Sequence, residues 1–291
     1  MNVLVLGVNG MIGSTMFRIL SEQLAWTVHG TVRGGRDVRG LPSSLCSKVL
    51  PQVDLATEGA LSKIMATVHP DVVVNCAGVT KHRPEGSRPI TAINMNAMLP
   101  HRLAETCAAS GARLLHISSD CVFSGARGNY TEKDAPDATD LYGRTKALGE
   151  VNGPRQITLR TSTIGHELQS KYGLLEWFLS QRKCSGYTRA VFSGLPSTTF
   201  AHIVRDSVIP NQQLNGLYHV TGPAIAKADL LALLARAYNK NIELLSDASF
   251  VINRSLNGDL FREATGYNSP PWPELIQFMH DDYQRNYTKN V

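Results

Sequence analysis

Hydrophobic and polar positions alternate in blocks along the first 160 residues, where short apolar runs are followed by longer stretches with helical spacing. Runs rich in Val, Leu and Ile are typical of buried strands, and apolar residues three and four apart are typical of amphipathic helices. The stretches that predict helices are 11–23, 90–110 and 141–152. The runs that predict strands are "NVLVLG" (2–7), "TVHGTV" (27–32), "DVVVNCA" (71–77), "ARLLHISS" (112–119) and "QITLRTS" (156–162).

This alternation predicts an α/β fold, a Rossmann-type doubly wound parallel sheet covered by helices on both faces. Such sheets bind ligands at the carboxyl ends of their strands. We expect this domain to span residues 1–165, with a returning segment near 200–215. Residues 166–291 are expected to form a smaller mixed α/β substrate-binding lobe, with a strand at "GLYHVTG" (216–222) and helices at 173–182, 226–238 and 272–287.

Composition indicates a globular protein and argues against binding of nucleic acid or metal and against a membrane span. The chain is 43% hydrophobic and 18% charged, which is typical of a globular protein, and its charge of +5 includes no basic tract that would favour nucleic acid. Its five cysteines form no C-x-x-C pair and no Cys/His cluster, which favours a reducing compartment and no metal. No apolar run approaches the ~18 residues of a membrane span. We therefore expect a cytoplasmic protein without nucleic-acid or membrane partners. The sequence leaves open whether the protein forms a homodimer.

A glycine-rich turn follows the first predicted strand. In "LVLGVNGMIGSTM", Gly7, Gly10 and Gly13 have the spacing G-x-x-G-x-x-G directly before a helix. The first glycine permits a tight turn, the second permits close approach of a pyrophosphate, and the third permits close packing of helix on strand. The loop predicts a dinucleotide site formed by Gly7, Asn9, Gly10, Met11, Ile12 and Gly13, with a purely structural turn as the alternative.

The second strand suggests which dinucleotide binds. An acidic residue that binds the adenosine ribose is usual about 20 residues after the glycines, but this chain has Arg33 there. A guanidinium suits a 2′-phosphate, so we predict NADP(H), with NAD(H) as the alternative and Arg36 as a second contact. Two solvated surface arginines are the competing interpretation. Further cofactor contacts are predicted at Asp54 and Leu55 near the adenine, with a turn role as the alternative for Asp54. They are also predicted at Cys76, Ala77 and Gly78 after a buried strand, where a simple exit from strand to loop is the alternative.

Tyr142 and Lys146 in "DLYGRTKAL" (140–148) are four residues apart, which places both side chains on one face of a helix. The ordinary tyrosine pKa near 10 is too high for efficient proton transfer at neutral pH. A neighbouring ammonium and an oxidised nicotinamide favour the phenolate, so we expect the pKa of Tyr142 to be lowered. Ser118 and Ser119 end the preceding strand, where a hydroxyl can hold a carbonyl oxygen as charge develops.

With these residues in order, the chain resembles the extended short-chain dehydrogenase/reductase superfamily. Within it, "HISSDCVFSG", "LYGRTKALGE", "ITLRTSTIG", "GLPSTTFA" and "GLYHVTG" are similar to successive motifs of the dTDP-4-dehydrorhamnose reductase family, from residue 1 to about 222. The resemblance implies catalytic roles for Ser119, Tyr142 and Lys146, and it makes Tyr142 and Lys146 cofactor contacts as well. It also implies that Asn96, or else Asn94, holds a water behind the lysine, and that Arg160 lies beside the nicotinamide.

Two positions depart from this family's pattern. Cys121 stands where the family has a tyrosine, and Thr163 stands where it tends to have a tryptophan. Both residues are predicted to line the sugar pocket with Ser118, Ser119 and Asp120. A glutamate that related dehydratases carry at this point is missing, which argues against dehydration. The loop at 192–202 is a further candidate for substrate contacts, and the segment at 80–88 is interpreted first as a solvated loop.

The resemblance implies an NADPH-dependent reductase of a nucleotide-activated 4-keto-6-deoxy sugar that serves surface polysaccharide synthesis. Tyr142 would protonate the keto oxygen, Ser119 would orient it, and Lys146 would tune Tyr142. Two alternatives remain. One is a nucleotide-sugar epimerase that retains NAD, and the other is a regulatory subunit that binds NADP without catalysis.

Overall fold

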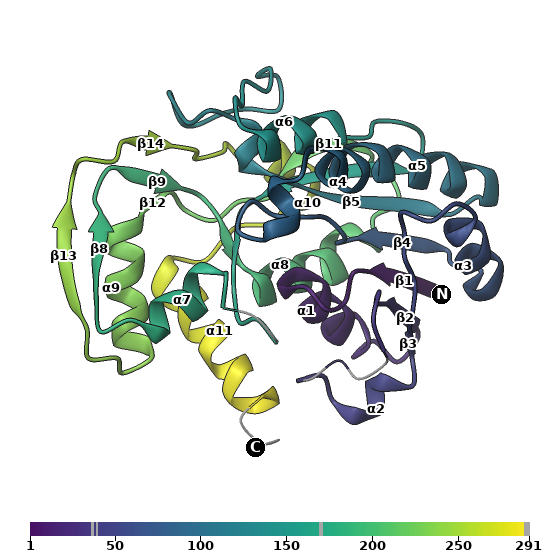
Figure 1. Ribbon diagram of the computed structural model, residues 1–291, viewed down its shortest axis with the longest axis horizontal. Helices are drawn as coiled ribbons and strands as arrows, with labels where there is room; N and C mark the ends of the chain where they lie inside the picture. Colours follow the sequence, from purple (N-terminus) through teal and green to yellow (C-terminus); the bar gives the residue numbers. More distant parts are fainter. Residues whose placement is uncertain (36–37, 39, 169–170, 288–291) are drawn as a thin grey trace.

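A seven-stranded sheet forms the centre of the molecule (Figure 1) in the computed structural model, which describes residues 1–35, 38, 40–168 and 171–287. Its strand order is β11-β6-β5-β4-β1-β2-β3, and every neighbouring pair is parallel. This confirms the predicted α/β doubly wound fold. The strands are β1 (Asn2–Leu6), β2 (Thr27–Thr31), β3 (Val49–Leu50), β4 (Val72–Asn75), β5 (Arg113–Ser119), β6 (Gln156–Thr161) and β11 (Gly216–His219).

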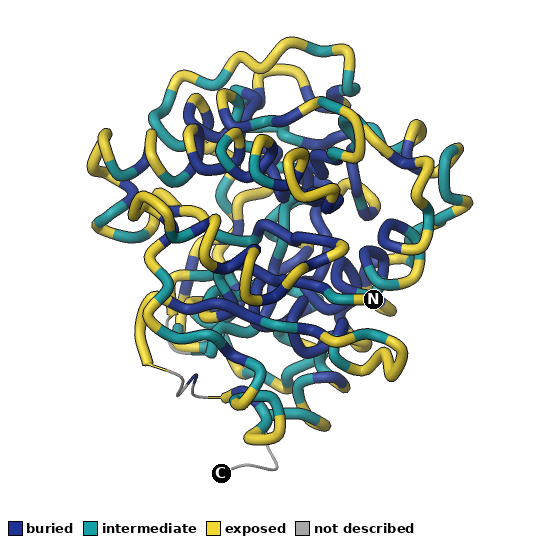
Figure 2. The backbone as a smooth tube through the Cα atoms, turned by 90° about the vertical axis from the view of Figure 1, so that its right-hand side faces the viewer, coloured by how far each residue is buried: buried dark blue, intermediate teal, exposed yellow. Residues whose placement is uncertain are grey.

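The two faces of the sheet bury separate hydrophobic clusters. Along β1, Val3 and Val5 point into one cluster while Leu4 and Leu6 point into the other, as the two-residue period of a strand requires. Helices α1 (Met11–Leu20) and α8 (Ser197–Ile203) pack together on the first face. Helices α3 (Ala60–Val68) and α5 (Leu99–Ser110) cover the second face. Buried positions therefore run through the middle of the molecule, as Figure 2 shows.

The predicted helix at 90–110 is continuous, but its hydrogen-bonding pattern changes along its length. It consists of α4 (Pro89–Ala92), the π-helical turn η2 (Ile93–Met98) and α5. Pro100 lies directly after the π turn, where a wider hydrogen-bonding pattern accommodates a residue without an N–H. The remaining helical segments of this part are α2 (Ser43–Cys46), η1 (Pro84–Ser87), η3 (Asp120–Val122) and α6 (Leu141–Leu148).

The later residues build a smaller group of elements, drawn on the left of Figure 1. Its helices are α7 (Leu174–Ser180), α9 (Lys227–Ala237) and α11 (Trp272–Asn286). Helix α10 (Asp259–Thr265) instead packs on β11 of the large sheet, near the middle of Figure 1. The sequence pattern did not predict the parallel pair β8 (Lys183–Tyr187) and β13 (Glu243–Asp247), because these strands are largely exposed and lack an apolar run. The other short strands are β7 (Thr163–Ile164), β9 (Ala190–Phe192), β10 (Leu195–Pro196), β12 (Ile225–Ala226) and β14 (Ile252–Asn253).

The chain returns from the smaller group of elements to the large sheet. After β10 it enters α8 and the π-helical turn η4 (Val204–Val208), and β11 then pairs with β6. Arg113 of β5 holds this segment, since its guanidinium donates to the carbonyls of Val208, Ile209 and Leu214 at 2.9, 3.2 and 2.7 Å. The division of the chain into domains at residue 165 stays a prediction.

Candidate active site

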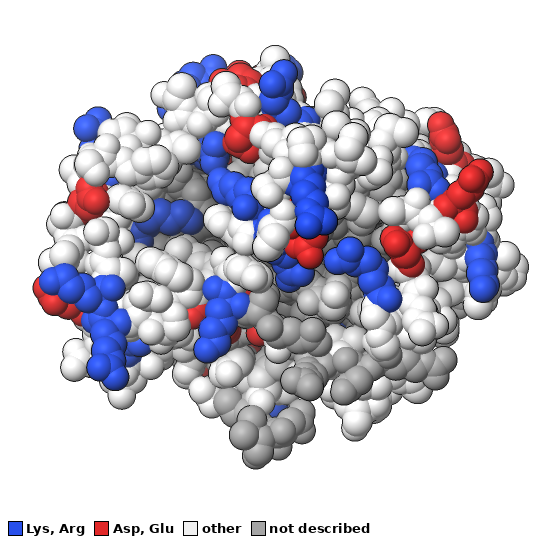
Figure 3. Space-filling view, viewed as in Figure 1, with Lys and Arg blue, Asp and Glu red and all other residues white. Residues whose placement is uncertain are grey.

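A cavity of about 790 Å³ opens at the carboxyl ends of β1, β4 and β5, between the large sheet and the smaller group of elements. This is the edge of the sheet where ligands bind in folds of this type. Lys and Arg side chains gather near the middle of the molecular face shown in Figure 3. Five of the cations that line the cavity are Arg33, Lys81, Arg83, Lys227 and Arg254.

The glycine loop forms one wall of the cavity. Gly7 has a φ of +81°, a left-handed conformation that only glycine adopts without strain. A Cβ at Gly13 would lie 2.1 Å from the carbonyl oxygen of Gly7, so the helix can approach the strand only because Gly13 has no side chain. A Cβ at Gly10 would meet the same oxygen at 3.5 Å, an ordinary contact. Gly7, Asn9, Gly10, Met11 and Ile12 line the cavity.

The residues predicted for the adenosine end divide into two groups. Arg33 and Leu55 line the cavity, and Arg33 is exposed. Asp54 does not line it, because its carboxylate accepts the Ala56 N–H at 3.0 Å within a turn. Arg36 lies outside the described residues. The structure therefore brings one predicted arginine to the cavity and places Asp54 in a turn beside it, and the predicted adenine contact of Asp54 stays a prediction.

Beyond β4 the chain continues along the cavity wall through Cys76, Ala77 and Gly78, as the sequence predicted. Asn75 at the end of β4 is fully buried, and its Oδ1 accepts the N–H of Ala77 at 3.1 Å. Ala77 also lies against Gly7, where an added Cβ would be 3.0 Å from its Cα. The ends of β1 and β4 therefore hold each other's loops in place.

Ser119 and Tyr142 face the same cavity from two elements. Ser119 ends β5, and its hydroxyl accepts the Cys121 N–H at 3.1 Å and donates to Asp120 at 3.2 Å. Tyr142 lies in the first turn of α6, where the Asp140 side chain caps the helix by accepting the Gly143 N–H at 2.9 Å. The predicted hydroxyl and phenol are thus brought together at one site.

The electrostatic surroundings of Tyr142 differ from the prediction. Burial raises the pKa of its phenol, Cys121, Asp120 and Asp140 raise it further, and a hydrogen bond with Ser119 lowers it. In the protein alone the Lys146 ammonium therefore does not lower this pKa below its usual value, and the lowering expected from an oxidised nicotinamide stays a prediction. The phenol is therefore protonated at neutral pH.

Lys146 lies one helical turn beyond Tyr142 and is buried beneath the cavity wall. Its ammonium donates to the carbonyl of Ile117 at 2.7 Å and lies 3.4 Å from Nε2 of His116. Burial lowers the pKa of Lys146 to about 8, while Glu150 and Cys76 act in the opposite direction. The positive charge of Lys146 is therefore present below pH 8 and lost as the pH rises through that value.

The side chain of Asn96 forms hydrogen bonds within the protein and does not line the cavity. Its amide bonds both peptide groups of Val79, donating at 3.0 Å and accepting at 2.9 Å, and it donates to Thr145 at 3.3 Å. It is 1% exposed, whereas Asn94 is exposed. These bonds tie the loop after β4 to helix α6, and the predicted water behind Lys146 stays untested.

Arg160 is not brought to the cavity, and the prediction that it contacts the nicotinamide needs correction. Its guanidinium makes two 2.7 Å bonds with Glu150 and lies over the ring of Phe123. His219 lies 3.2 Å from it on the neighbouring strand. A buried cation needs a paired anion, and Glu150 supplies it ten residues earlier in the chain. Arg160 is therefore part of a buried ion pair beneath the site.

The predicted substrate residues Ser118, Ser119, Asp120, Cys121 and Thr163 all line the cavity. Sequence reasoning missed three features here: Lys227, Arg254 and the role of the loop that contains Lys81. The ammonium of Lys227, at the start of α9, lies 3.5 Å from the ring centre of Phe192. Arg254 lies 3.6 Å from the sulfur of Cys121 and donates to the carbonyl of Phe123. Lys227 and Arg254 lie beyond residue 222, where the resemblance of the sequence to the family's successive motifs ends, so none of these motifs marks them.

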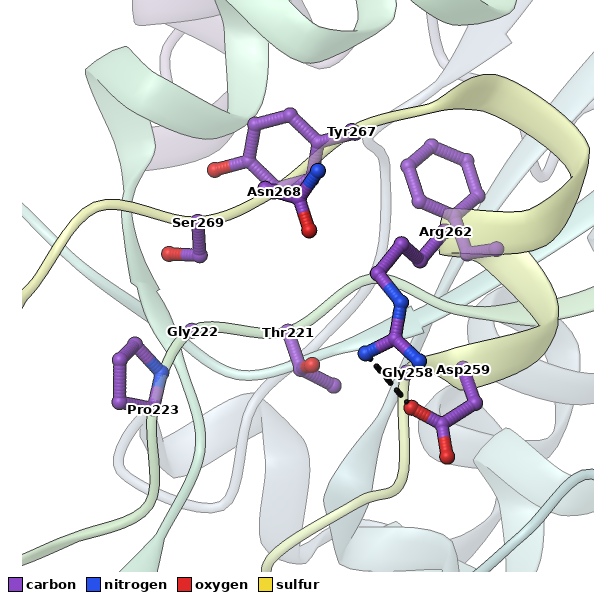
Figure 4. A pocket seen from close by; sticks show the side chains of 10 residues that line it. Thr221, Gly222, Pro223, Gly258, Asp259, Arg262, Tyr267, Asn268 and Ser269 are labelled. Carbon is purple, nitrogen blue, oxygen red and sulfur yellow. Dashed lines mark ion pairs between the residues drawn. The ribbon is translucent and has the colours of Figure 1, made fainter.

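A second cavity of about 260 Å³ lies apart from this site (Figure 4). Thr221, Gly222 and Pro223 face α10 and the segment at 267–269 across it. Arg262 pairs with Asp259 at 2.9 Å on its rim. None of the predicted site residues lines this cavity.

Metal binding and membrane crossing find no support among the described residues. Over the ranges that the structure describes, no group of three or more His, Cys, Asp or Glu side chains has the geometry to hold a metal ion. Among the described helices, none combines the length and the apolar composition that a membrane crossing requires.

The parallel sheet, the glycine loop and the Ser119–Tyr142–Lys146 set define the class, an extended short-chain dehydrogenase/reductase fold. Residues 1–237 match the family described as RmlD substrate binding domain, and the chain belongs to this family.

Known relatives match over part of their length. The chain is 34% identical over 148 residues to methionine adenosyltransferase 2 subunit beta of Rattus norvegicus, a match that covers 51% of this chain and 41% of the relative. It is 36% identical over 151 residues to dTDP-4-dehydrorhamnose reductase of Mycolicibacterium smegmatis, covering 51% and 40%. The chain thus spans less than half the length of these relatives.

A solved structure is similar over the whole chain. The structure of dTDP-4-dehydrorhamnose reductase from Bacillus anthracis in complex with NADP has a TM-score of 0.77 at 18% identity, and covers 97% of this chain and 99% of that one. At this level of identity the similarity establishes the fold.

Proposed function

We propose that the chain is an NADP(H)-dependent reductase of a nucleotide-activated keto sugar. The observation that supports this most directly is that the glycine loop, Ser119 and Tyr142 line one cavity. One relative is named dTDP-4-dehydrorhamnose reductase, and a reductase of similar structure was solved in complex with NADP. A 4-keto-6-deoxy sugar destined for surface polysaccharide is the substrate that this resemblance favours.

The residues present fit a dinucleotide. The backbone at Gly10 faces the cavity without a side chain, and α1 begins there with no side-chain cap, so its first N–H groups can bind a pyrophosphate. Arg33 can bind a 2′-phosphate, while Cys76, Ala77 and Gly78 form the wall toward the nicotinamide. When bound, NADPH supplies the hydride for the keto carbon.

The protein's own groups then handle the oxygen and its proton. Tyr142 has a raised pKa and so carries its proton at neutral pH, as a general acid must. The Ser119 hydroxyl can donate to the keto oxygen as negative charge develops there. Lys227, Arg254 and Lys81 line the cavity as cations that suit the diphosphate of a nucleotide sugar.

The test is a screen of NADPH oxidation against a panel of nucleotide 4-keto sugars that differ in nucleotide and sugar. We expect stoichiometric consumption of NADPH with at least one member. Turnover of a nucleotide sugar without added NADPH would instead support the epimerase that retains NAD.

A regulatory subunit is the second candidate, favoured by the 34% identity to subunit beta of methionine adenosyltransferase 2. Such a protein would bind NADP and leave every keto sugar unchanged. NADPH binding by fluorescence together with no oxidation across the panel would support it over the reductase.

A further inference from the structure

His116 is a fully buried histidine on β5 that the proposed reaction does not use, and its ring lies between Asn75 and Lys146. One ring nitrogen, Nδ1, is 3.0 Å from the amide nitrogen of Asn75. The other, Nε2, is 3.4 Å from the ammonium nitrogen of Lys146. A neutral imidazole carries a proton on only one of its two ring nitrogens. Which nitrogen carries it decides whether Lys146 faces an N–H donor or a lone pair that accepts.

The hydrogen bonds fix that position. The Ala77 N–H donates to Oδ1 of Asn75, so this amide cannot be turned around without facing two donors toward each other. Nδ2 of Asn75 is therefore the group that faces His116, and it donates to Nδ1. Since Nδ1 accepts, the proton of the neutral ring lies on Nε2, which points toward Lys146.

The ring is neutral in this setting. Burial lowers the pKa of His116 well below its usual value, and Lys146 and His101 lower it further. The charged or titratable groups around Lys146 are Cys76 after β4, His116 on β5, and Tyr142 and Glu150 on or just after α6. Glu150 and Cys76 favour the ammonium, whereas an N–H from His116 favours the amine.

We propose that His116 is a positioning residue that presents its Nε2–H to Lys146, with Asn75 fixing this tautomer. An ammonium has three donors and no acceptor, so it gains nothing from a facing N–H, whereas a neutral amine accepts one. The Ala77–Asn75–His116 chain therefore weakens the ammonium form. It also connects the cavity wall at Ala77 to the protonation of Lys146.

The arrangement has a kinetic consequence, which rests on the proposed reductase function. Lys146 is a stronger acid than Tyr142, because burial lowers the pKa of the amine to about 8 against the effect of Glu150 and Cys76, while burial and nearby acidic groups raise that of the phenol. The pH at which Lys146 loses its proton then sets the pH above which Tyr142 has no positive charge one helical turn away, and His116 lowers this pH.

The tautomer is tested directly on the parent protein. Two-bond ¹⁵N–¹H spectra of histidine-labelled protein at pH 7, with H116Q for assignment, should show His116 protonated on Nε2 and unprotonated on Nδ1. Protonation on Nδ1 would overturn the proposal. This measurement requires no activity.

The coupling is tested by titrating Lys146 in ¹³C-lysine-labelled protein, with K146M for assignment. In N75D the carboxylate accepts from Nδ1–H, which turns the Nε2 lone pair toward Lys146, and its negative charge acts in the same direction, so the pKa of Lys146 should rise from about 8 to about 9 or above. The neutral H116Q variant is free of this charge effect. H116Q, which can present its oxygen, should move the pKa in the same direction. I117V trims a neighbouring side chain on β5 without changing these hydrogen bonds and should leave the pKa unchanged.

An unchanged Lys146 pKa in both N75D and H116Q would refute the proposal. Its failure is separable from failure of the proposed function. If the NMR result holds while no keto sugar is reduced, the tautomer stands and the reductase assignment fails. If reduction proceeds, the alkaline limb of kcat/KM should move upward in N75D by the same amount as the pKa of Lys146.

Discussion

At the scale of single residues, Tyr142 has the protonation state that a reduction needs. A phenol with a raised pKa is protonated across the neutral range, so it can give a proton to a developing alkoxide without first having to acquire one. The opposite reaction, oxidation of an alcohol, needs a base. The protonation state of Tyr142 in the protein alone thus matches the proposed reduction.

Replacing this acid should separate chemistry from binding. We expect Y142F to reduce the rate of NADPH oxidation with a keto sugar by about 10²- to 10⁴-fold, the usual contribution of a general acid. Its affinity for NADPH should change little, since the ring remains. Fluorescence titration and steady-state rates give the two readouts, and a near-parent rate would show that another group is the acid.

Lys227 provides a prediction for substrate binding. Its ammonium is partly buried at the cavity wall, and burial lowers its pKa to about 8, while Asp120 and Cys121 oppose this. A charge-assisted bond to a diphosphate contributes about 1.5–3 kcal/mol. We expect K227M to raise the KM for the nucleotide sugar about 10- to 100-fold with unchanged NADPH affinity.

The matched control for Lys227 is K183M. Lys183 is exposed and pairs with Glu243 outside the cavity lining, so its removal should leave both KM values unchanged. Equal effects of the two substitutions would contradict a specific role for Lys227.

At the scale of elements, the turn from β1 into α1 assigns different tasks to two glycines. G13A should displace the helix, because its Cβ would lie 2.1 Å from the Gly7 carbonyl oxygen. G10A fits the backbone but occupies space facing the cavity. We expect G13A to lower the free energy of unfolding by about 1–3 kcal/mol, and G10A to leave it nearly unchanged.

The affinity for NADPH should separate G10A from G13A in a second way, because G10A is expected to lose cofactor binding while it keeps its stability. G10A should weaken NADPH binding in a protein with parent-like urea unfolding, because the methyl group keeps the pyrophosphate away from the loop. A G10A protein that binds NADPH as the parent does would contradict the predicted place of the phosphates.

The strands also show which parts of the fold can be predicted from the sequence. Buried strands such as β1 and β4 consist of continuous apolar runs, and a parallel sheet needs them, so they were predictable. The strands β8 and β13 were not, because they are short and exposed. Within the site, residues on motifs next to β1, β4 and β5 lie at the cavity, whereas Arg160 does not. The position of Arg160 depends on its ion pair with Glu150, which no local pattern reveals.

At the scale of the whole molecule, a buried ion pair joins the first and last helices. Arg18 of α1 bonds Asp282 of α11, and both side chains are almost fully buried, at 4% and 6% exposed. Removing one partner of a buried pair leaves an uncompensated charge, which costs about 3–5 kcal/mol. We expect D282N to lower the free energy of unfolding by an amount of this order, measured by urea denaturation.

Arg18 also supplies the control for this prediction. It pairs with Glu22 at 3.2 Å, but that carboxylate is 47% exposed. E22Q should therefore cost less than about 1 kcal/mol, as solvent-exposed pairs do. Comparable losses in E22Q and D282N would show that burial does not decide the effect.

The repeated passage of the chain between the large sheet and the smaller group of elements has a mechanical consequence. The backbone crosses after β6, again between β10 and α8, and once more between β11 and β12. Three such connections restrict hinge motion between the two parts more than a single connection would. Small-angle scattering curves recorded with and without NADP(H) should therefore superimpose. On the proposed function, selection among sugars would then depend on which of them fits the cavity in its resting shape.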